Sequence, residues 1–272
     1  MTVESLEQLK KICQKQNYRT NGNWMARHIT RDMALPLTRL LLSTPVTANQ
    51  ISFLTMLTSV FSAFFLAGPG PKSFLVGACL WQFWYLLDHV DGQIARYRKS
   101  VAPEGLFLDF MMHHLANLIL PFGVGAHLFF LTAEPLALFT GFASSVSLGM
   151  IAILNDCKAK AAVEYLTKDG RPAAAHTPVS SSGAGRSLPK KVFSMLHKSC
   201  EGHVVMNVIS VFSIFYFFHP DIKSAVPALW FLTGYYGFVA SVVWAYRLYY
   251  FVTSKQVTAY VSEVNSRLAG ER

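Results

Sequence analysis

Long apolar segments dominate the chain, and charged residues interrupt them at only a few places. Six segments are apolar enough to be considered as membrane spans: residues 51–68, 72–87, 115–133, 135–154, 203–220 and 224–246. A helix needs roughly 20 apolar residues to cross a bilayer core of about 30 Å. The pattern therefore predicts an all-α integral membrane protein with six transmembrane helices, of which the second and fifth are short.

The Lys and Arg residues are distributed unevenly between the two sides of these segments. With the N-terminus in the cytosol, residues 1–50, 88–104, 155–202 and 247–272 face the cytosol and contain 22 of the 24 basic residues. Only Lys72 and Lys223 fall on the other side. Because cytosolic loops of membrane proteins are enriched in Lys and Arg, this split supports six spans. We expect a cell inner (plasma) membrane protein whose active site faces the cytosol.

Composition changes the picture in two respects. Of the 272 residues, 52% are hydrophobic and 14% are charged, whereas soluble domains carry about 25% charged residues. This argues against a soluble enzyme. The net charge of +9 fits contact with anionic membrane lipid in so apolar a chain, and we expect no nucleic-acid partner. The four cysteines match no zinc or redox spacing, so we interpret them as free thiols.

Two regions outside the spans have patterns of their own. Residues 25–41 place apolar side chains at helical spacing, which predicts an amphipathic helix on the membrane surface, with an ordinary soluble helix as the alternative. Residues 169–191 are rich in Ala, Ser, Gly and Pro, which predicts a flexible loop within about 157–200. The chain is thus divided into a cytosolic N-terminal segment (1–45), a six-helix membrane domain (46–253) and a cytosolic C-terminal tail (254–272).

Acidic side chains gather where the second and third spans meet the cytosol. Asp88 and Asp91 are three positions apart, and Asp109 and His113 are four apart, so each pair shares a helix face. Three adjacent carboxylates need a counter-charge, and oxygen ligands favour Mg²⁺, Mn²⁺ or Ca²⁺. Intramembrane acids are functional by default. The alternative is a set of helix-end acids paired with nearby cations: Arg96, Arg98 and Lys99.

Small residues beside the acids leave room for a ligand. Gly92 follows Asp91, and Ala95 lies three positions further on, so a nucleotide could approach the backbone there. Arg96 supplies a cation for a phosphate. Gly105, at the start of the third helix, allows close helix approach.

Read in order, these residues form one spaced pattern. It runs Asp88-x-x-Asp91-Gly92-x-x-Ala95-Arg96, eight residues, Gly105, three residues, Asp109, three residues, His113. This resembles the signature of the CDP-alcohol phosphotransferase (CDP-alcohol phosphatidyltransferase) family, with seven of the eight fixed positions matching. Residues 45–52, which include Asn49, resemble the start of the family's first span, with Ala48 replacing the usual proline. The resemblance covers roughly residues 25–250.

The resemblance implies a specific activity and assembly. Members transfer a substituted phosphate from a CDP-linked donor to an acceptor hydroxyl and release CMP, usually as homodimers in a membrane. By resemblance, two divalent metal ions, Mg²⁺ or Mn²⁺, are held by Asp88, Asp91 and Asp109. The CDP group is framed by Asn49, Gly92, Ala95, Arg96 and Gly105.

His113 stands where the family usually has its last aspartate, the catalytic base. Three interpretations are open. Neutral His113 could take the proton of the acceptor, because its reference pKa of about 6.5 suits that reaction. It could instead be a nitrogen ligand that shifts metal preference toward Mn²⁺ or Zn²⁺, or the site could be degenerate. His114 points about 100° away on a helix, so we expect it to pack or to contact lipid headgroups.

The acceptor site is less defined by the sequence. Arg27 and Arg31 could hold an acceptor or lipid phosphate, or simply face solvent or lipid. Further polar residues at helix ends could line the cavity: Asn117, Asn155, Asp156, His203 and Asn207. His127 lies within the third span, where we expect a hydrogen bond to a neighbouring helix.

Two other functional classes remain. A membrane prenyltransferase also binds diphosphate through aspartate-bound Mg²⁺, but no second DxxD-like motif follows Asp109. A catalytically degenerate scaffold or transporter is supported only by the missing fourth aspartate.

Overall fold

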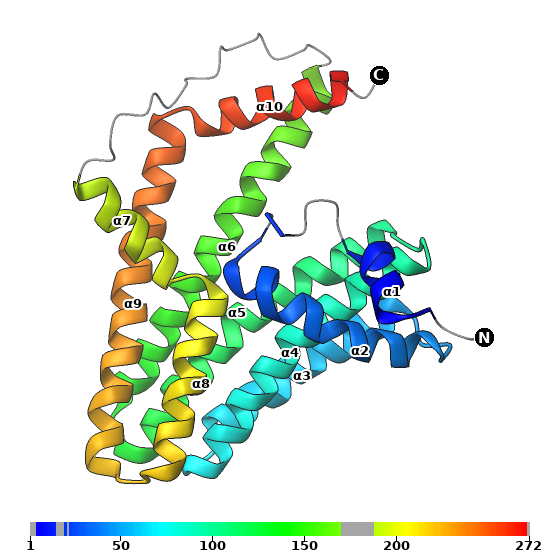
Figure 1. The fold of residues 1–272 in the computed structure, drawn as a ribbon. Helices are drawn as coiled ribbons and strands as arrows, with labels where there is room; N and C mark the ends of the chain where they lie inside the picture. Colours follow the sequence, from blue (N-terminus) through cyan, green and yellow to red (C-terminus); the bar gives the residue numbers. More distant parts are fainter. Residues whose placement is uncertain (1–3, 15–18, 21, 170–187, 271–272) are drawn as a thin grey trace.

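The computed structural model describes residues 4–14, 19–20, 22–169 and 188–270, which are helical and contain no strand (Figure 1). The elements are α1 (Leu6–Cys13), the short π-helix η1 (Ala26–Thr30), α2 (Arg31–Leu42), α3 (Ala48–Ala67), α4 (Pro71–Tyr97), α5 (Pro103–Thr132), α6 (Pro135–Asp169), α7 (Leu188–Ser199), α8 (Gly202–Phe218), α9 (Ile222–Thr253) and α10 (Gln256–Gly270). The all-α prediction is confirmed for these residues.

Local sequence sets the ends of the helices around the acidic cluster. Thr47 begins α3 with a capping box, in which its side chain accepts from the Gln50 backbone and the Gln50 side chain accepts from the Thr47 backbone. Pro71 and Pro103 occupy the first turns of α4 and α5, where the missing N–H has no helical partner to lose. α5 ends at Ala133, which adopts a left-handed conformation with φ of 56°.

The helices pack as a bundle with shorter elements across one end. α3 packs against α4 and α5, α5 against α6, α6 against α9, and α4 against α8. α1 and α2 contact α4, and α10 contacts α6 and α9 (Figure 1). The short elements thus lie at the end of the bundle that carries the acidic cluster.

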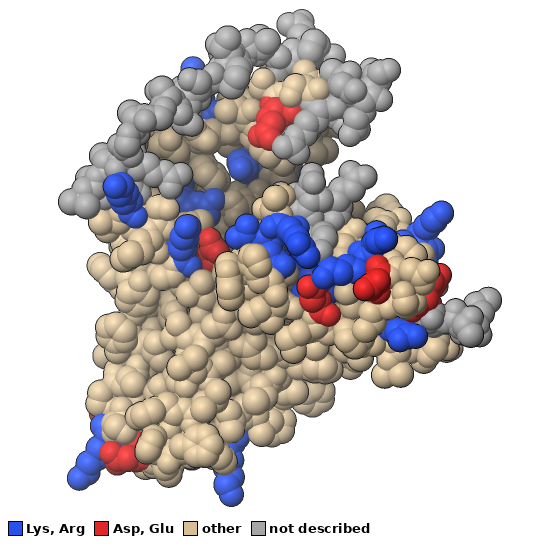
Figure 2. Space-filling view, viewed as in Figure 1, with Lys and Arg blue, Asp and Glu red and all other residues tan. Residues whose placement is uncertain are grey.

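Several helices are long and apolar enough to cross a membrane, so this is an integral membrane protein. Within the described residues these are α3, α5, residues 135–167 of α6, and α9; α7 and α8 together make a fifth candidate that is bent by 62°. All six predicted segments coincide with helices, but a count of six spans is not confirmed, because α4 is not among the candidates. Figure 2 shows a broad surface without charge between a charged band and a few charged residues at the opposite end.

The prediction of a flexible loop over about 157–200 is wrong at both of its ends. α6 continues to Asp169, and α7 covers Leu188–Ser199. Residues 170–187, the centre of the predicted loop, lie outside the described residues. Ala, Lys and Glu recur in 158–168, and these residues favour helix. The helix therefore extends well beyond the apolar part of α6.

The amphipathic segment predicted for 25–41 is helical, as η1 followed by α2. Ala34, Leu35 and Thr38 are buried on one side of it, whereas Met33 and Leu40 are exposed. One side of the segment thus packs against the protein, and apolar side chains are exposed on another side. Its position on the membrane surface stays a prediction.

Candidate active site

A cavity of about 620 Å³ lies where the C-terminal part of α4 meets the N-terminal part of α5. The two helices are joined by residues 98–102, so the acids that follow one another in sequence are brought together in space. Every residue that the sequence analysis assigned to the site lines this cavity: Asn49, Asp88, Asp91, Gly92, Ala95, Arg96, Gly105, Asp109 and His113.

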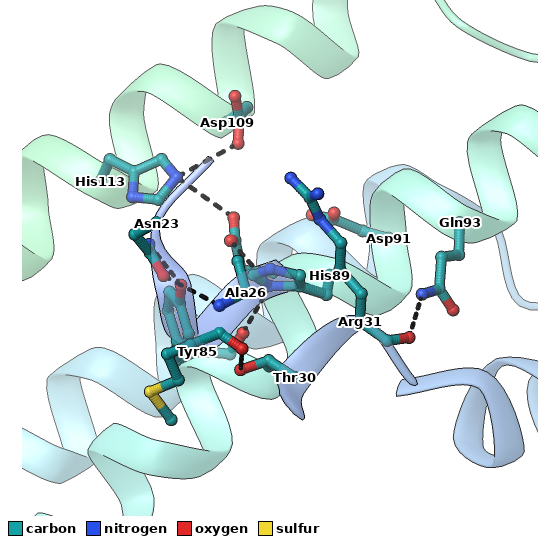
Figure 3. Close-up of polar contacts among 12 residues, drawn as sticks. Asn23, Ala26, Thr30, Arg31, Tyr85, His89, Asp91, Gln93, Asp109 and His113 are labelled. Atoms are coloured by element: carbon teal, nitrogen blue, oxygen red, sulfur yellow. Dashed lines mark hydrogen bonds and ion pairs between the residues drawn. The ribbon is translucent and has the colours of Figure 1, made fainter. Parts of the chain in front are cut away.

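Asp88, Asp109 and His113 form a close group in the cavity, and Figure 3 shows the His113 ring directed toward Asp109. His113 Nε2 lies 3.1 Å from Asp88 Oδ1 and 3.5 Å from Asp109 Oδ1. One potential ligand atom from each residue lies within 4.8 Å of the others. Carboxylate oxygens and an imidazole nitrogen suit a divalent cation such as Mn²⁺. The cluster therefore could hold a metal ion.

Asp91 faces the same cavity but is not part of that three-residue group. It is 8% exposed, and Ser52 of α3 donates a hydrogen bond of 2.6 Å to its Oδ2. Ser52 thus fixes one carboxylate oxygen, and the Gly92 backbone N–H also donates to this carboxylate. The sequence analysis did not identify Ser52, although its hydroxyl lies one turn after Asn49 on α3.

Asp88 and Arg98 have different partners, so the two do not form the ion pair that the alternative interpretation requires. Among the described residues, Asp88 pairs with His113 and with His89, whose Nδ1 is 3.4 Å away. Arg98 instead donates to the backbone oxygens of Thr44 and Val46. The structure therefore gives no support to helix-end acids paired with Arg98.

Glycines bring the cavity walls close together at two points. A Cβ placed on Gly92 would lie 3.1 Å from Arg96 Nη1, so the Arg96 guanidinium lies across Gly92. A Cβ on Gly105 would lie 3.3 Å from Asn49 Oδ1, so the start of α5 faces the start of α3. Both glycines keep side chains out of the space beside the acids.

The N-terminal segment forms a wall that the sequence analysis largely missed. Arg96 Nε donates to the backbone oxygen of Cys13, and Asn23 Nδ2 donates to Tyr85 Oη over 2.8 Å. Gln93 Nε2 donates to the Arg31 backbone oxygen over 2.9 Å. Burial raises the pKa of the Cys13 thiol to about 11, so this cysteine is a neutral thiol.

Arg31, the arginine named as a possible phosphate ligand, lines the cavity, and Arg27 does not. A Cβ on Gly22 would lie 2.8 Å from Arg31 Nη2, and Gly22 has φ of 97°. Gly22 therefore provides both the left-handed turn and the space that this guanidinium needs.

The other polar residues considered for the acceptor site do not line this cavity: Asn117, Asn155, Asp156, His203 and Asn207. His114 pairs with Asp156 over 2.7 Å, so the expectation of simple packing or headgroup contact is corrected. Asn155 accepts from Arg247 over 2.7 Å. His127 Nδ1 donates over 2.8 Å to the backbone oxygen of Gly68, the residue that follows α3, rather than to a residue within a helix.

Trp84 completes the surroundings of the cluster from the buried side. Its ring meets the His113 ring edge to face, with centroids 5.4 Å apart and an interplanar angle of 87°. The sequence analysis did not connect Trp84 with His113.

Fold and cavity together define a helical membrane protein with a carboxylate–histidine site between two adjacent helices. Comparison with known families then gives its relationship. Residues 45–174, just under half of the chain, match the family model of CDP-alcohol phosphatidyltransferase. The match contains all nine predicted site residues and excludes the N-terminal wall. No curated protein matches the chain.

Proposed function

We propose that the protein transfers a substituted phosphate from a CDP-linked donor to an acceptor hydroxyl and releases CMP, in the synthesis of a phospholipid or phosphodiester headgroup. The observation that carries this proposal is the convergence of Asp88, Asp109 and His113 in a cavity that also contains Asp91 and Arg96. The family match supports a membrane transferase of this kind. The donor is either CDP-diacylglycerol or a CDP-linked polar alcohol.

We further propose two divalent ions, Mg²⁺ or Mn²⁺, as cofactors. Asp88, Asp109 and His113 would hold one, and Asp91, oriented by Ser52, would share in the second. When bound, such ions neutralise charge on a diphosphate and on the departing CMP. The donor set of oxygen atoms and one imidazole fits either ion.

The chain's own residues then bind and orient the reactants. Arg96, fixed by the Cys13 backbone oxygen and lying across Gly92, binds the diphosphate of the donor. The acceptor hydroxyl gives its proton to a base, its oxygen forms a bond to the β-phosphorus, and the bond from that phosphorus to the bridging oxygen breaks, so that CMP leaves with this oxygen. Positioning and charge neutralisation dominate such a reaction. Arg31 also lines the cavity, where it would bind an anionic group of the second substrate.

His113 is a candidate for two roles that require different hydrogen positions. As a ligand, Nε2 gives its lone pair to the ion and Nδ1 carries the hydrogen. As a base, a ring nitrogen must be free to take the proton of the acceptor hydroxyl. The position of Nε2 between two carboxylates favours the ligand role, and the base role stays a prediction.

Release of CMP tests the proposal. Purified protein in detergent is incubated with CDP-diacylglycerol or CDP-linked alcohols, a panel of hydroxyl acceptors, and Mg²⁺ or Mn²⁺. We expect CMP and a lipid product that mass spectrometry identifies. No CMP from any pair would favour the degenerate scaffold or transporter, whose support is the absence of the family's fourth aspartate.

The variant His113→Ala separates the two roles of this residue. A lost base lowers turnover by about 10²–10⁴-fold at any metal concentration. A lost ligand instead raises the metal concentration needed for half-maximal activity, and added Mn²⁺ restores turnover. Full turnover of the variant at saturating metal would exclude the base role.

Membrane orientation and assembly complete the proposal. The basic residues support a cytosolic active site in a cell inner membrane. We propose a homodimer by analogy with the family, which cross-linking in native membranes would test.

A further inference from the structure

His113 is contacted by α4 at two successive turns. Asp88 and Trp84 are four positions apart on α4, so they share a helix face. Asp88 Oδ1 lies 3.1 Å from Nε2 of the imidazole, and the Trp84 indole meets the imidazole ring edge to face at 5.4 Å. One turn of α4 therefore fixes the polar end of the ring, and the preceding turn fixes its plane.

Trp84 is held by packing. It is 6% exposed and belongs to the main apolar core, and its Nε1 has no hydrogen-bond partner among the described residues. A buried N–H without a partner destabilises a protein. The shape of the indole, and not a hydrogen bond of its N–H, is therefore what this position contributes, and phenylalanine should supply much of the same ring surface.

Outside these contacts and the Asp109 ion pair, His113 borders the open cavity. The side chain is 41% exposed on the cavity side, and the second side-chain torsion of histidine has a broad range. A turned ring would carry Nε2 away from Asp88 and Asp109. Trp84 forms the ring contact on the buried side that opposes this rotation. An aspartate at position 113, as in the family signature, is too short to make this contact with the Trp84 ring.

We propose that Trp84 is a positioning residue that holds the His113 imidazole with Nε2 directed at Asp88 and Asp109. In this proposal, Trp84 and His113 together replace the usual aspartate. The activity measurements that follow depend on the proposed transferase function. The metal-binding measurement does not depend on it.

A double-mutant cycle tests the pairing. We compare wild type, Trp84→Leu, His113→Asp and the double variant for Mn²⁺ binding, measured by electron paramagnetic resonance in detergent, and for CMP release. Aromatic pair energies correspond to about three- to tenfold effects, and we expect Trp84→Leu to weaken Mn²⁺ binding and lower kcat by such a factor. With His113→Asp already present, the same substitution should change both by less than about twofold. Trp84→Phe should restore most of the loss.

Two controls keep a folding defect apart from a loss of positioning. Trp81→Leu removes another buried tryptophan one turn earlier on α4, and it should lower thermal stability while leaving Mn²⁺ binding per folded molecule unchanged. The proposal would be overturned if Trp84→Leu weakened Mn²⁺ binding equally in the wild-type protein and in the His113→Asp variant. If wild type binds Mn²⁺ with the expected coupling but releases no CMP, the transferase function fails and the positioning role stands.

Discussion

His113 and His127 lie on the same helix, α5, and meet opposite surroundings. His113 is 41% exposed, faces a cavity, and directs Nε2 at two carboxylates. His127 is fully buried, donates through Nδ1 to the Gly68 backbone oxygen, and lies against the rings of Phe74 and Tyr216. α5 positions both side chains, but only His113 lies beside charged groups and an open cavity, both of which are needed to bind a charged ligand.

Glycines also differ between the cavity end of the bundle and the opposite end. At the cavity end, Gly92 and Gly105 lie beside the tips of the Arg96 and Asn49 side chains. At the other end, a Cβ on Gly125 would lie 2.5 Å from Gly141 Cα, which is backbone. The first glycines leave room for a ligand, and the second allows two helices to touch. Substitutions should therefore affect activity at one end and stability at the other.

The largest effect is expected from Asp91→Asn. The amide keeps the shape and a hydrogen bond to Ser52 but loses the charge, so kcat/KM for CMP release should fall on the order of 10³-fold. Asp32→Asn is the matched control, because Asp32 pairs with Lys10 on an exposed surface. A loss of less than tenfold for Asp91→Asn would contradict a role for this carboxylate in the reaction.

Gly92→Ala should weaken donor binding with little change in stability. The new Cβ displaces the end of a flexible side chain, Arg96, and should raise KM for the CDP-linked donor about tenfold, which corresponds to about 1.4 kcal/mol. Gly234→Ala, where nothing lies within 4 Å of the added Cβ, controls for a generic Gly→Ala effect in a helix. An unchanged donor KM would show that Arg96 does not bind the donor through this contact.

Gly125→Ala should lower stability with little change in activity. Because the added Cβ meets the backbone of α6, α5 and α6 must separate, and overpacking of this kind costs about 1–3 kcal/mol. Thermal unfolding in detergent should show the loss, with kcat per folded molecule unchanged. A stable but inactive variant would mean that this end of the bundle also shapes the site.

The smallest effect is expected from His127→Phe. The aromatic ring against Phe74 and Tyr216 is retained, and only the hydrogen bond to Gly68 is lost, which costs about 0.5–1.5 kcal/mol of stability. Activity should stay at the wild-type level. If CMP release instead fell as it does in His113 variants, the contrast between the two histidines would be wrong.

The signature residues of the cavity could be predicted because they belong to one local sequence pattern. Asp88, Asp91, Asp109 and His113 lie on two helices joined by a short segment, so helical spacing alone brings them together. The interpretation of 157–200 as a loop failed because the Ala-, Ser- and Gly-rich centre outweighed helix-forming residues on either side.

The N-terminal wall could not be predicted from spacing. Its contacts join residues far apart in sequence, such as Asn23 with Tyr85 and Cys13 with Arg96. The edge-to-face contact of Trp84 with His113 was missed for the same reason. An aromatic residue in an apolar segment gives no sign of which neighbour it will meet.

The hydrogen bond from Arg96 to the Cys13 backbone oxygen joins two parts of the chain that sequence similarity treats separately. The region shared with the family begins at residue 45, whereas the enclosure around the site begins with Gln14. A protein trimmed to the shared region would keep the whole acidic signature and lose one side of its binding chamber. Exchange of the first 44 residues between related chains would then alter which substrates are accepted while every signature residue stays in place.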